Sequence, residues 1–471
     1  IIKVILLKYY IFVINIMRLA LIIFFFISQN IFSQQLKISG EIVGLEDNDI
    51  MFGYYYGEKQ YIKDTIPCIN GKFVISSSDK VDKGIYFILL NDNQNFQILI
   101  NEDLVFSFKT DISEIISKMK FINSNENSKF YEFQKFTSKK NLEVLPLKNK
   151  LEEITIDDIE YSETFNKIEK INLEVINFKN NFMKKNLNSF FVKLLKSNEQ
   201  VTIPQDFQTD EKSKYFYFIN NYWNNFDLSD SRILFTPIFH NRLEEYISKY
   251  TPQIPDSINK YLDILLSKVQ ASDKLFEYII NWSTYKYESS KIMGHDAVFV
   301  HIVYKYFMTG QVNWIDDVKL TNIIDKAMRL NPNLIGKKAP FLKLKNENNE
   351  YKDLHKITSD YTVLSFYDPD CGHCKKEIPK IKNVTDGFSK KVVQVYAVCT
   401  EFDSTIWKQF IKKNQIDKWI NVIDIENQSN FRRKYNIMGT PRLYLLDKNK
   451  VIIAKQIDSS TLEEILNKRI N

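Results

Sequence analysis

The pattern of apolar and polar positions changes twice along this chain. From Leu36 to about Ile115, apolar and polar residues alternate in short stretches separated by Gly, Asn and Asp, which predicts strands at LKISGEIVG, DIMFGYYYG, GKFVISSS, GIYFILLND, FQILINEDL and VFSFKT. From about Glu126 to Leu330, apolar residues recur at helical spacing with Lys and Glu on the opposite face. Beyond the Pro- and Gly-containing stretch NPNLIGKKAP, strand-like and helix-like stretches alternate, and two strands near the end form a predicted hairpin.

These patterns predict a multidomain chain, because 471 residues exceed what one core usually holds. We expect an all-β sandwich or barrel at 34–125, an all-α domain at 126–332 and an α/β domain at 333–471. The hydrophobic fraction of 44% and the charged fraction of 26% are typical of globular proteins. The net charge of +6 is spread along the chain without a basic run, which gives no support to a nucleic-acid partner.

Residues 1–33 form an expected upstream extension and signal peptide. From the first Met, Met17, the sequence MRLALIIFFFISQNIFSQQ has a charged start at Arg18, an apolar segment and a plausible cleavage position after Ser33. The apolar segment Leu19–Ile27 is shorter than the roughly 20 residues that span a bilayer, although an uncleaved anchor over 4–32 is an alternative. We therefore expect export to the periplasm or cell envelope.

The helical region contains two groups of side chains that were considered as sites. The aromatic stretch YFYFINNYWNNF at 215–226 could bind a sugar or a peptide, but aromatic residues at helical spacing more often form core. His240, His295 and His301 lack the i, i+4 spacing of metal ligands, which favours structural roles.

Cysteine is sparse, with only Cys68, Cys371, Cys374 and Cys399 in the chain, so a disulfide framework is not expected. Cys68, in a predicted turn, is interpreted as a half-buried small residue. Cys399 ends a predicted core strand and is either an extra resolving thiol or, as we favour, a small buried residue.

The stretch DPDCGHCKKEIP at 368–379 carries the strongest chemical signal. Cys371 follows a predicted strand and opens a predicted helix, where free backbone N–H groups and the helix dipole favour a thiolate. Cys374 is placed to close a short disulfide with Cys371. A cationic His373 would stabilise the thiolate, whereas the carboxylate of Asp370 would disfavour it, so the direction of electron flow stays open.

Other uses of this pair are less well supported. A zinc site needs four ligands, and covalent haem attachment needs a His directly after the second Cys, where Lys375 stands. A purely structural disulfide across two residues would gain little loop entropy. A redox-active pair is the favoured interpretation.

Residues 333–471 resemble the thioredoxin-fold domain of TlpA/ResA-like envelope thiol–disulfide oxidoreductases. The resemblance rests on GKKAPFLKL, TVLSFYD, CGHCKKEIP and GTPRLYLLD. Pro379 matches the proline that kinks the active-site helix, and Gly439-Thr440-Pro441 matches the cis-proline loop that faces the cysteines. The chain departs from the pattern at Asp370, where an aromatic residue is usual, and at Ser365, which replaces the buried acid of plain thioredoxin.

The resemblance implies a role for each matching residue. Cys371 would be the nucleophile and Cys374 the resolving thiol, with a redox disulfide between them. Glu377 would accept or relay the proton of Cys374, with a helix-surface glutamate as the alternative. Thr440 and a cis-Pro441 would offer backbone groups to an extended substrate strand.

The expected function is thiol–disulfide exchange with protein thiols, with no cofactor and no metal, and with a membrane electron donor or acceptor as partner. A thiol peroxidase is an alternative, although such enzymes usually carry Thr three residues before the nucleophile, where Asp368 stands here. A second alternative is a glycan- or partner-binding envelope protein in which the disulfide is structural.

Overall fold

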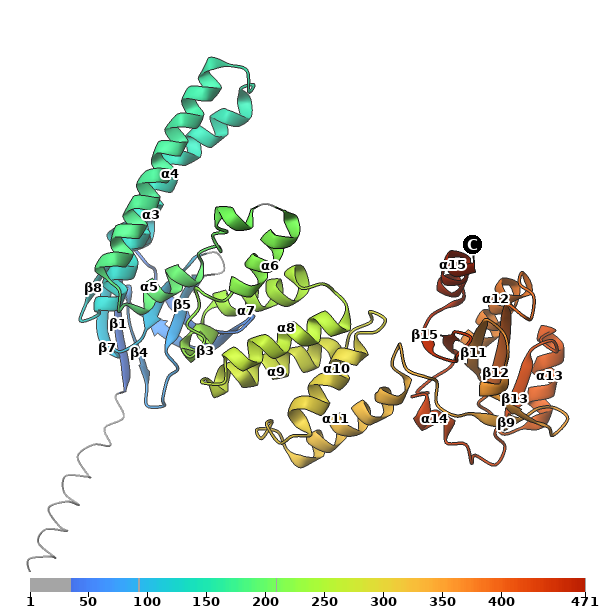
Figure 1. Cartoon of the computed structure of the whole chain (residues 1–471). Helices are drawn as coiled ribbons and strands as arrows, with labels where there is room; N and C mark the ends of the chain where they lie inside the picture. Colours follow the sequence, from blue (N-terminus) through green and yellow to red (C-terminus); the bar gives the residue numbers. More distant parts are fainter. Residues whose placement is uncertain (1–34, 92–93, 209, 471) are drawn as a thin grey trace, which may run out of the picture. The chain divides into compact units, whose positions relative to one another are not determined.

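The computed structural model describes residues 35–91, 94–208 and 210–470 (Figure 1). Contacts between residues divide the chain into two compact units, one ending at Tyr246 and one beginning at Ile247. The division falls within the stretch predicted as one helical domain, and each unit is described by itself. The predicted signal peptide lies outside the described residues.

The first unit begins with two four-stranded sheets, in the orders β4-β1-β7-β8 and β3-β2-β5-β6. Phe108 of the first sheet contacts Phe96 of the second with ring centroids 5.5 Å apart, so the sheets pack face to face as a sandwich. The strands are β1 Leu36–Val43, β2 Asn48–Tyr56, β3 Lys59–Cys68, β4 Lys72–Ser77, β5 Gly84–Asn91, β6 Gln94–Ile100, β7 Val105–Asp111 and β8 Lys120–Ile122. The expected strand-rich N-terminal region is therefore confirmed.

Strand β3 is absent from the sequence prediction. Its first seven residues are all exposed, so the strand shows no alternation of apolar and polar residues until its last three positions. Cys68 is the last residue of this strand and is only 2% exposed, so the predicted half-buried position in a turn is wrong.

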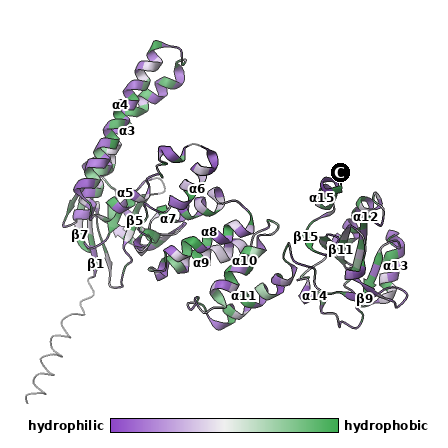
Figure 2. Ribbon diagram, viewed as in Figure 1, coloured by the Kyte–Doolittle hydropathy of each residue, from purple (hydrophilic) through white to green (hydrophobic). Residues whose placement is uncertain are grey.

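The helices of the first unit follow the sandwich. The two longest, α3 and α4, form a hairpin that extends beyond the sheets (Figure 1), and hydrophilic and hydrophobic residues alternate along both (Figure 2). Phe136 and Phe178 stack across the hairpin with ring centroids 3.9 Å apart. The helices are α2 Ile115–Lys118, α3 Asn125–Glu153, α4 Ile159–Lys185, α5 Phe190–Ser197, α6 Glu211–Asn221 and α7 Pro237–Glu244.

The aromatic stretch at 215–226 contributes mainly to this core. Tyr222 and Trp223 are almost fully buried, and Tyr222 stacks on Tyr246 at 5.1 Å, which supports the core interpretation. Phe216 is the exception, at 41% exposed.

The second unit begins with a group of helices: α8 Pro255–Lys268, α9 Asp273–Glu288, α10 Asp296–Ile302 and α11 Asp317–Leu330. Nε2 of His301 lies 3.0 Å from both carboxylate oxygens of Asp263, and Nδ1 of His295 lies 3.0 Å from the hydroxyl of Ser290. These contacts agree with the structural roles expected for both histidines. No helix in the described ranges is both long and apolar enough to cross a membrane.

The rest of the second unit is an α/β domain around a seven-stranded sheet in the order β10-β9-β13-β12-β11-β14-β15. The central strands β11, β12 and β13 are parallel, and β14 runs antiparallel to β11. Six of the seven residues of β11 and all seven of β12 are buried, which explains their nearly continuous apolar sequences. The expected thioredoxin-like α/β domain is therefore confirmed.

The strands of this domain are β9 Lys343–Lys345, β10 Tyr351–Asp353, β11 Tyr361–Tyr367, β12 Val393–Cys399, β13 Ile420–Ile423, β14 Arg442–Leu446 and β15 Ile452–Lys455. Its helices are α12 Gly372–Asp386, α13 Ser404–Asn414, α14 Phe431–Lys434 and α15 Ser459–Ile470.

A buried ion pair connects this sheet to the preceding helices within the second unit. The ammonium group of Lys455 contacts the carboxylate of Asp296 at the start of α10 and the backbone oxygen of Asn333 at 3.0 Å. The side chain of Lys455 is only 3% exposed. The predicted ends of the individual domains remain predictions.

Candidate active site

Cys371 stands at the junction between the central strand β11 and helix α12. The chain leaves the sheet after Tyr367, and Cys371 is the N-cap residue of α12. The first N–H groups of a helix have no partner within it, so they are free to bind the side chain of the capping residue. The backbone amides of Cys374 and His373 accordingly hydrogen-bond the sulfur of Cys371.

The two thiols of the pair are in different environments. Both are free in this structure; Cys371 is partly exposed, whereas Cys374 is fully buried. Burial opposes ionisation of Cys371, but the hydrogen bonds from Cys374 and from the Thr440 side chain outweigh it and lower its pKa below the usual value. Burial raises the pKa of Cys374 to about 11. Cys371 is therefore the more readily ionised and the more accessible thiol.

The loop that precedes β14 closes over Cys371. Thr440 and Pro441 are joined by a cis peptide bond, as expected from the resemblance. The sulfur of Cys371 lies 3.4 Å from the carbonyl oxygen of Thr440. Antiparallel pairing of Arg442 with Phe366 of β11 carries this loop to the site. The role of Thr440 and Pro441 in binding substrate remains a prediction.

Asp370 and His373 lie on the exposed side of the pair. The backbone amide of Asp370 donates to the carboxylate of Asp368 at 2.7 Å, and the Asp370 carboxylate lies 3.8 Å from the Lys375 ammonium group. Because both charged side chains are at least half exposed, solvent screens this pair. His373 contacts Cys371 through its backbone amide, so a tuning role for its imidazole remains a prediction.

The backbone amide of Asp368, which sequence analysis missed, donates to the sulfur of Cys374 at 3.5 Å. A backbone donor leaves no mark in the residue type, so only the strand-to-helix turn itself could have indicated it.

Glu377 is directed toward helix α15. Its carboxylate accepts a 2.6 Å hydrogen bond from the backbone amide of Ser459, the first residue of α15, and lies 3.6 Å from the ammonium group of Lys380. A carboxylate at a helix N-terminus stabilises that helix. No hydrogen bond between Glu377 and Cys374 occurs within the described residues. Its proposed part in proton transfer remains a prediction, beside a capping role that the sequence did not indicate.

The floor of the site is apolar. Cys374 shares one buried core with Cys399, Tyr367 and Trp407, and the indole N–H of Trp407 donates to the Tyr367 hydroxyl at 3.1 Å. Cys399 is 1% exposed, and burial raises its pKa to about 12, which agrees with the favoured interpretation of a buried core residue. Ser365 is also fully buried on β11, and its hydroxyl has no hydrogen-bond partner in the described part of the chain.

A dithiol held between a strand end, a helix N-terminus and a cis-proline loop is the arrangement of thioredoxin-like proteins. Comparison with known proteins agrees: residues 335–455 match the AhpC/TSA family. The sporulation thiol–disulfide oxidoreductase A of Bacillus subtilis is 28% identical over 107 residues, which are 22% of this chain and 63% of that protein. The thiol–disulfide oxidoreductase ResA of Bacillus cereus is 22% identical over 131 residues, which are 28% of this chain and 74% of that protein.

A solved domain of a possible thiol–disulfide isomerase from Cytophaga hutchinsonii is 41% identical. The match covers 29% of this chain and 93% of that domain, with a TM-score of 0.28. Through its C-terminal domain the chain belongs to the thioredoxin-like thiol–disulfide oxidoreductases of the AhpC/TSA family. Residues 36–130 and 162–329 match two families described as domains of unknown function, DUF4369 and DUF5106.

Proposed function

We propose that this protein is a thiol–disulfide oxidoreductase of the cell envelope that exchanges disulfides with protein thiols through Cys371 and Cys374. The observation that carries the proposal is the inequality of the two thiols. Cys371 is accessible and has a lowered pKa, whereas Cys374 is buried with a pKa of about 11. Such a pair divides the reaction between an attacking and a resolving sulfur.

In the reducing direction, the Cys371 thiolate attacks one sulfur of a substrate disulfide. A mixed disulfide forms, and the other substrate sulfur leaves as a thiolate. Cys374 then loses its proton and attacks the sulfur of Cys371, which releases the second substrate thiolate and leaves a Cys371–Cys374 disulfide. Two electrons pass to the substrate, and the oxidising direction is the reverse.

The loop at Thr440 suits an extended substrate strand. The Thr440 carbonyl faces the sulfur of Cys371, so a backbone that pairs with this loop would bring its own disulfide beside that sulfur. Protein substrates with an exposed cysteine in an extended segment are therefore the substrate class that we propose.

Each turnover leaves the Cys371–Cys374 pair in the opposite redox state, so a second partner must restore it. We propose a membrane protein with its own dithiol or disulfide for this step. The signal-like sequence that starts at Met17 supports a place in the periplasm or cell envelope. Cell fractionation tests the location, and recovery of the protein only with cytoplasmic markers would contradict it.

Reduction of insulin disulfides by dithiothreitol tests the activity. We expect the full-length protein to accelerate insulin precipitation, Cys371→Ser to abolish the acceleration and Cys399→Ser to leave it unchanged. Wild-type acceleration by Cys371→Ser would overturn the proposal.

A further inference from the structure

The first unit contains a cavity that is separate in sequence from the thiol site. Its volume is about 630 Å³, and it lies between the C-terminal part of α4, helix α5 and the turn that follows α6. Pockets that bind small molecules usually measure about 300–1,000 Å³ and combine an apolar lining with a few polar groups. Nothing in the exchange reaction of Cys371 and Cys374 requires this cavity.

The lining of the cavity includes an apolar part. Met183, Leu187, Val192 and Phe226 all contribute to it. Val192 and Phe226 are well buried, whereas Leu187 is 73% exposed. Such a lining favours a ligand with an apolar body, since burial of apolar surface contributes about 25 cal/mol per Å².

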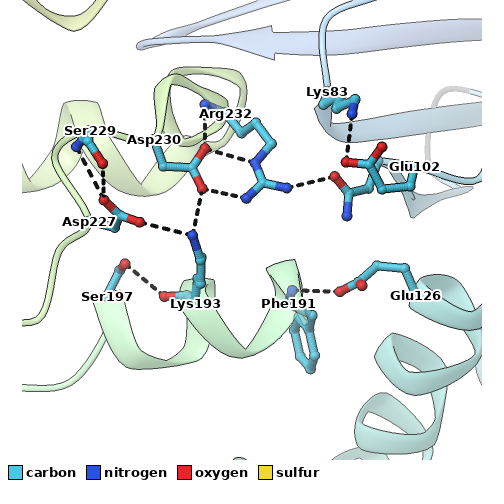
Figure 3. Close-up of polar contacts among 11 residues, drawn as sticks. Lys83, Glu102, Glu126, Phe191, Lys193, Ser197, Asp227, Ser229, Asp230 and Arg232 are labelled. Atoms are coloured by element: carbon cyan, nitrogen blue, oxygen red, sulfur yellow. Dashed lines mark hydrogen bonds and ion pairs between the residues drawn. The ribbon is translucent and has the colours of Figure 1, made fainter. Parts of the chain in front are cut away.

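One wall of the cavity carries charges that cancel one another (Figure 3). The ammonium group of Lys193 lies 2.9 Å from the carboxylate of Asp227 and 3.2 Å from that of Asp230. The guanidinium group of Arg232 donates two hydrogen bonds to Asp230 and a third to Asn101 of the β-sandwich. The two acids and two bases of this wall therefore leave no charge for a ligand.

Two other lysines of the lining remain without a carboxylate partner. Glu199 also lines the cavity, but its carboxylate is paired with Lys179 at 3.0 Å. Within the described ranges, no acidic side chain forms an ion pair with Lys184 of α4 or Lys196 of α5, both of which line the cavity. The cavity thus presents an apolar lining and two ammonium groups that are not neutralised.

We infer that this cavity binds a small amphiphilic anion, with its apolar body against Met183, Val192 and Phe226 and a single acidic head group between Lys184 and Lys196. A carboxylate or a sulfonate would satisfy both ammonium groups through charge-assisted hydrogen bonds. The inference goes beyond the exchange reaction and does not depend on it.

Fluorescence titration of the full-length protein with 8-anilinonaphthalene-1-sulfonate tests this inference. The probe combines an apolar ring system with one sulfonate. We expect saturable binding at one site, displacement by dodecanoate and no displacement by the neutral amphiphile dodecyl maltoside. In the double variant Lys184→Glu/Lys196→Glu, the affinity should fall by about tenfold or more, because both favourable contacts become repulsive.

Lys185→Glu is the matched control. Lys184 and Lys185 both lie in the last turn of α4, where a cation compensates the helix dipole, but only Lys184 lines the cavity. We expect Lys185→Glu to retain wild-type affinity, and circular dichroism should show that both variants are folded. Equal losses in Lys184→Glu and Lys185→Glu, displacement by dodecyl maltoside, or unsaturable binding would overturn the inference.

Discussion

The sulfur of Cys371 lies 3.4 Å from the carbonyl oxygen of Thr440, a residue 69 positions later in the chain. The contact exists because β14, which follows Pro441 directly, pairs with the strand that leads to Cys371. The Thr440 side chain also hydrogen-bonds the sulfurs of both Cys371 and Cys374, and in each case it lowers the pKa. Thr440 therefore contributes both to the geometry of the site and to its ionisation.

Replacement of Thr440 by Val should slow the reaction of Cys371 with iodoacetamide at pH 7. The variant loses a hydrogen bond to the thiolate, worth about 1 kcal/mol, so we expect a rate about fivefold lower. Because the pKa of Cys371 is lowered, its wild-type rate should level off below pH 9, and the variant should level off at higher pH. Identical pH profiles for the two proteins would show that the Thr440 hydroxyl does not act on Cys371.

Glu377→Ala should destabilise the C-terminal domain through helix α15. The Glu377 carboxylate accepts from the first backbone amide of α15, and loss of such a cap costs about 1 kcal/mol. Glu377→Gln keeps an acceptor oxygen and should lose less stability in urea denaturation. If Glu377 also relays the proton of Cys374, Glu377→Gln should slow release of a mixed disulfide without changing the attack by Cys371. An unchanged stability of Glu377→Ala would contradict the capping role.

Cys399→Ser should retain the exchange activity within about twofold, because the buried Cys399 thiol, with a pKa of about 12, takes no part in the proposed steps. A modest loss of thermal stability is expected from a hydroxyl placed in an apolar core. A loss of activity as large as that of Cys374→Ser, measured by insulin reduction, would instead assign a resolving role to Cys399.

Lys455→Met should destabilise the second unit more strongly than a comparable change on the surface. Loss of one partner of a buried ion pair costs about 3–5 kcal/mol, because the Asp296 carboxylate is left without its cation. Lys352→Met is the control, since Lys352 pairs with Glu350 at the surface and should contribute about 0–1 kcal/mol. Equal urea midpoints for the two variants would show that the pair of Lys455 and Asp296 does not stabilise the unit.

The sequence was most informative where local pattern and chemistry agree. Strands β11 and β12 are almost entirely apolar, and the CGHC stretch follows directly on β11, so the C-terminal domain and its cysteine pair were predicted in place. Strand β3 could not be predicted, because it is exposed along most of its length and carries no period. The bond from Ser459 to Glu377 and the pairing of Lys455 with Asp296 join residues 82 and 159 positions apart, which no local pattern encodes.

The division of roles between Cys371 and Cys374 is the central claim, and trapping of the mixed disulfide tests it most directly. Cys374→Ser can attack a disulfide but cannot resolve the product, so reaction with a disulfide-bonded peptide should yield one stable adduct. Intact-mass measurement followed by peptide mapping should place that adduct on Cys371, and Cys371→Ser should give none. An adduct on Cys374 in Cys371→Ser, formed as fast as the one on Cys371, would contradict the account.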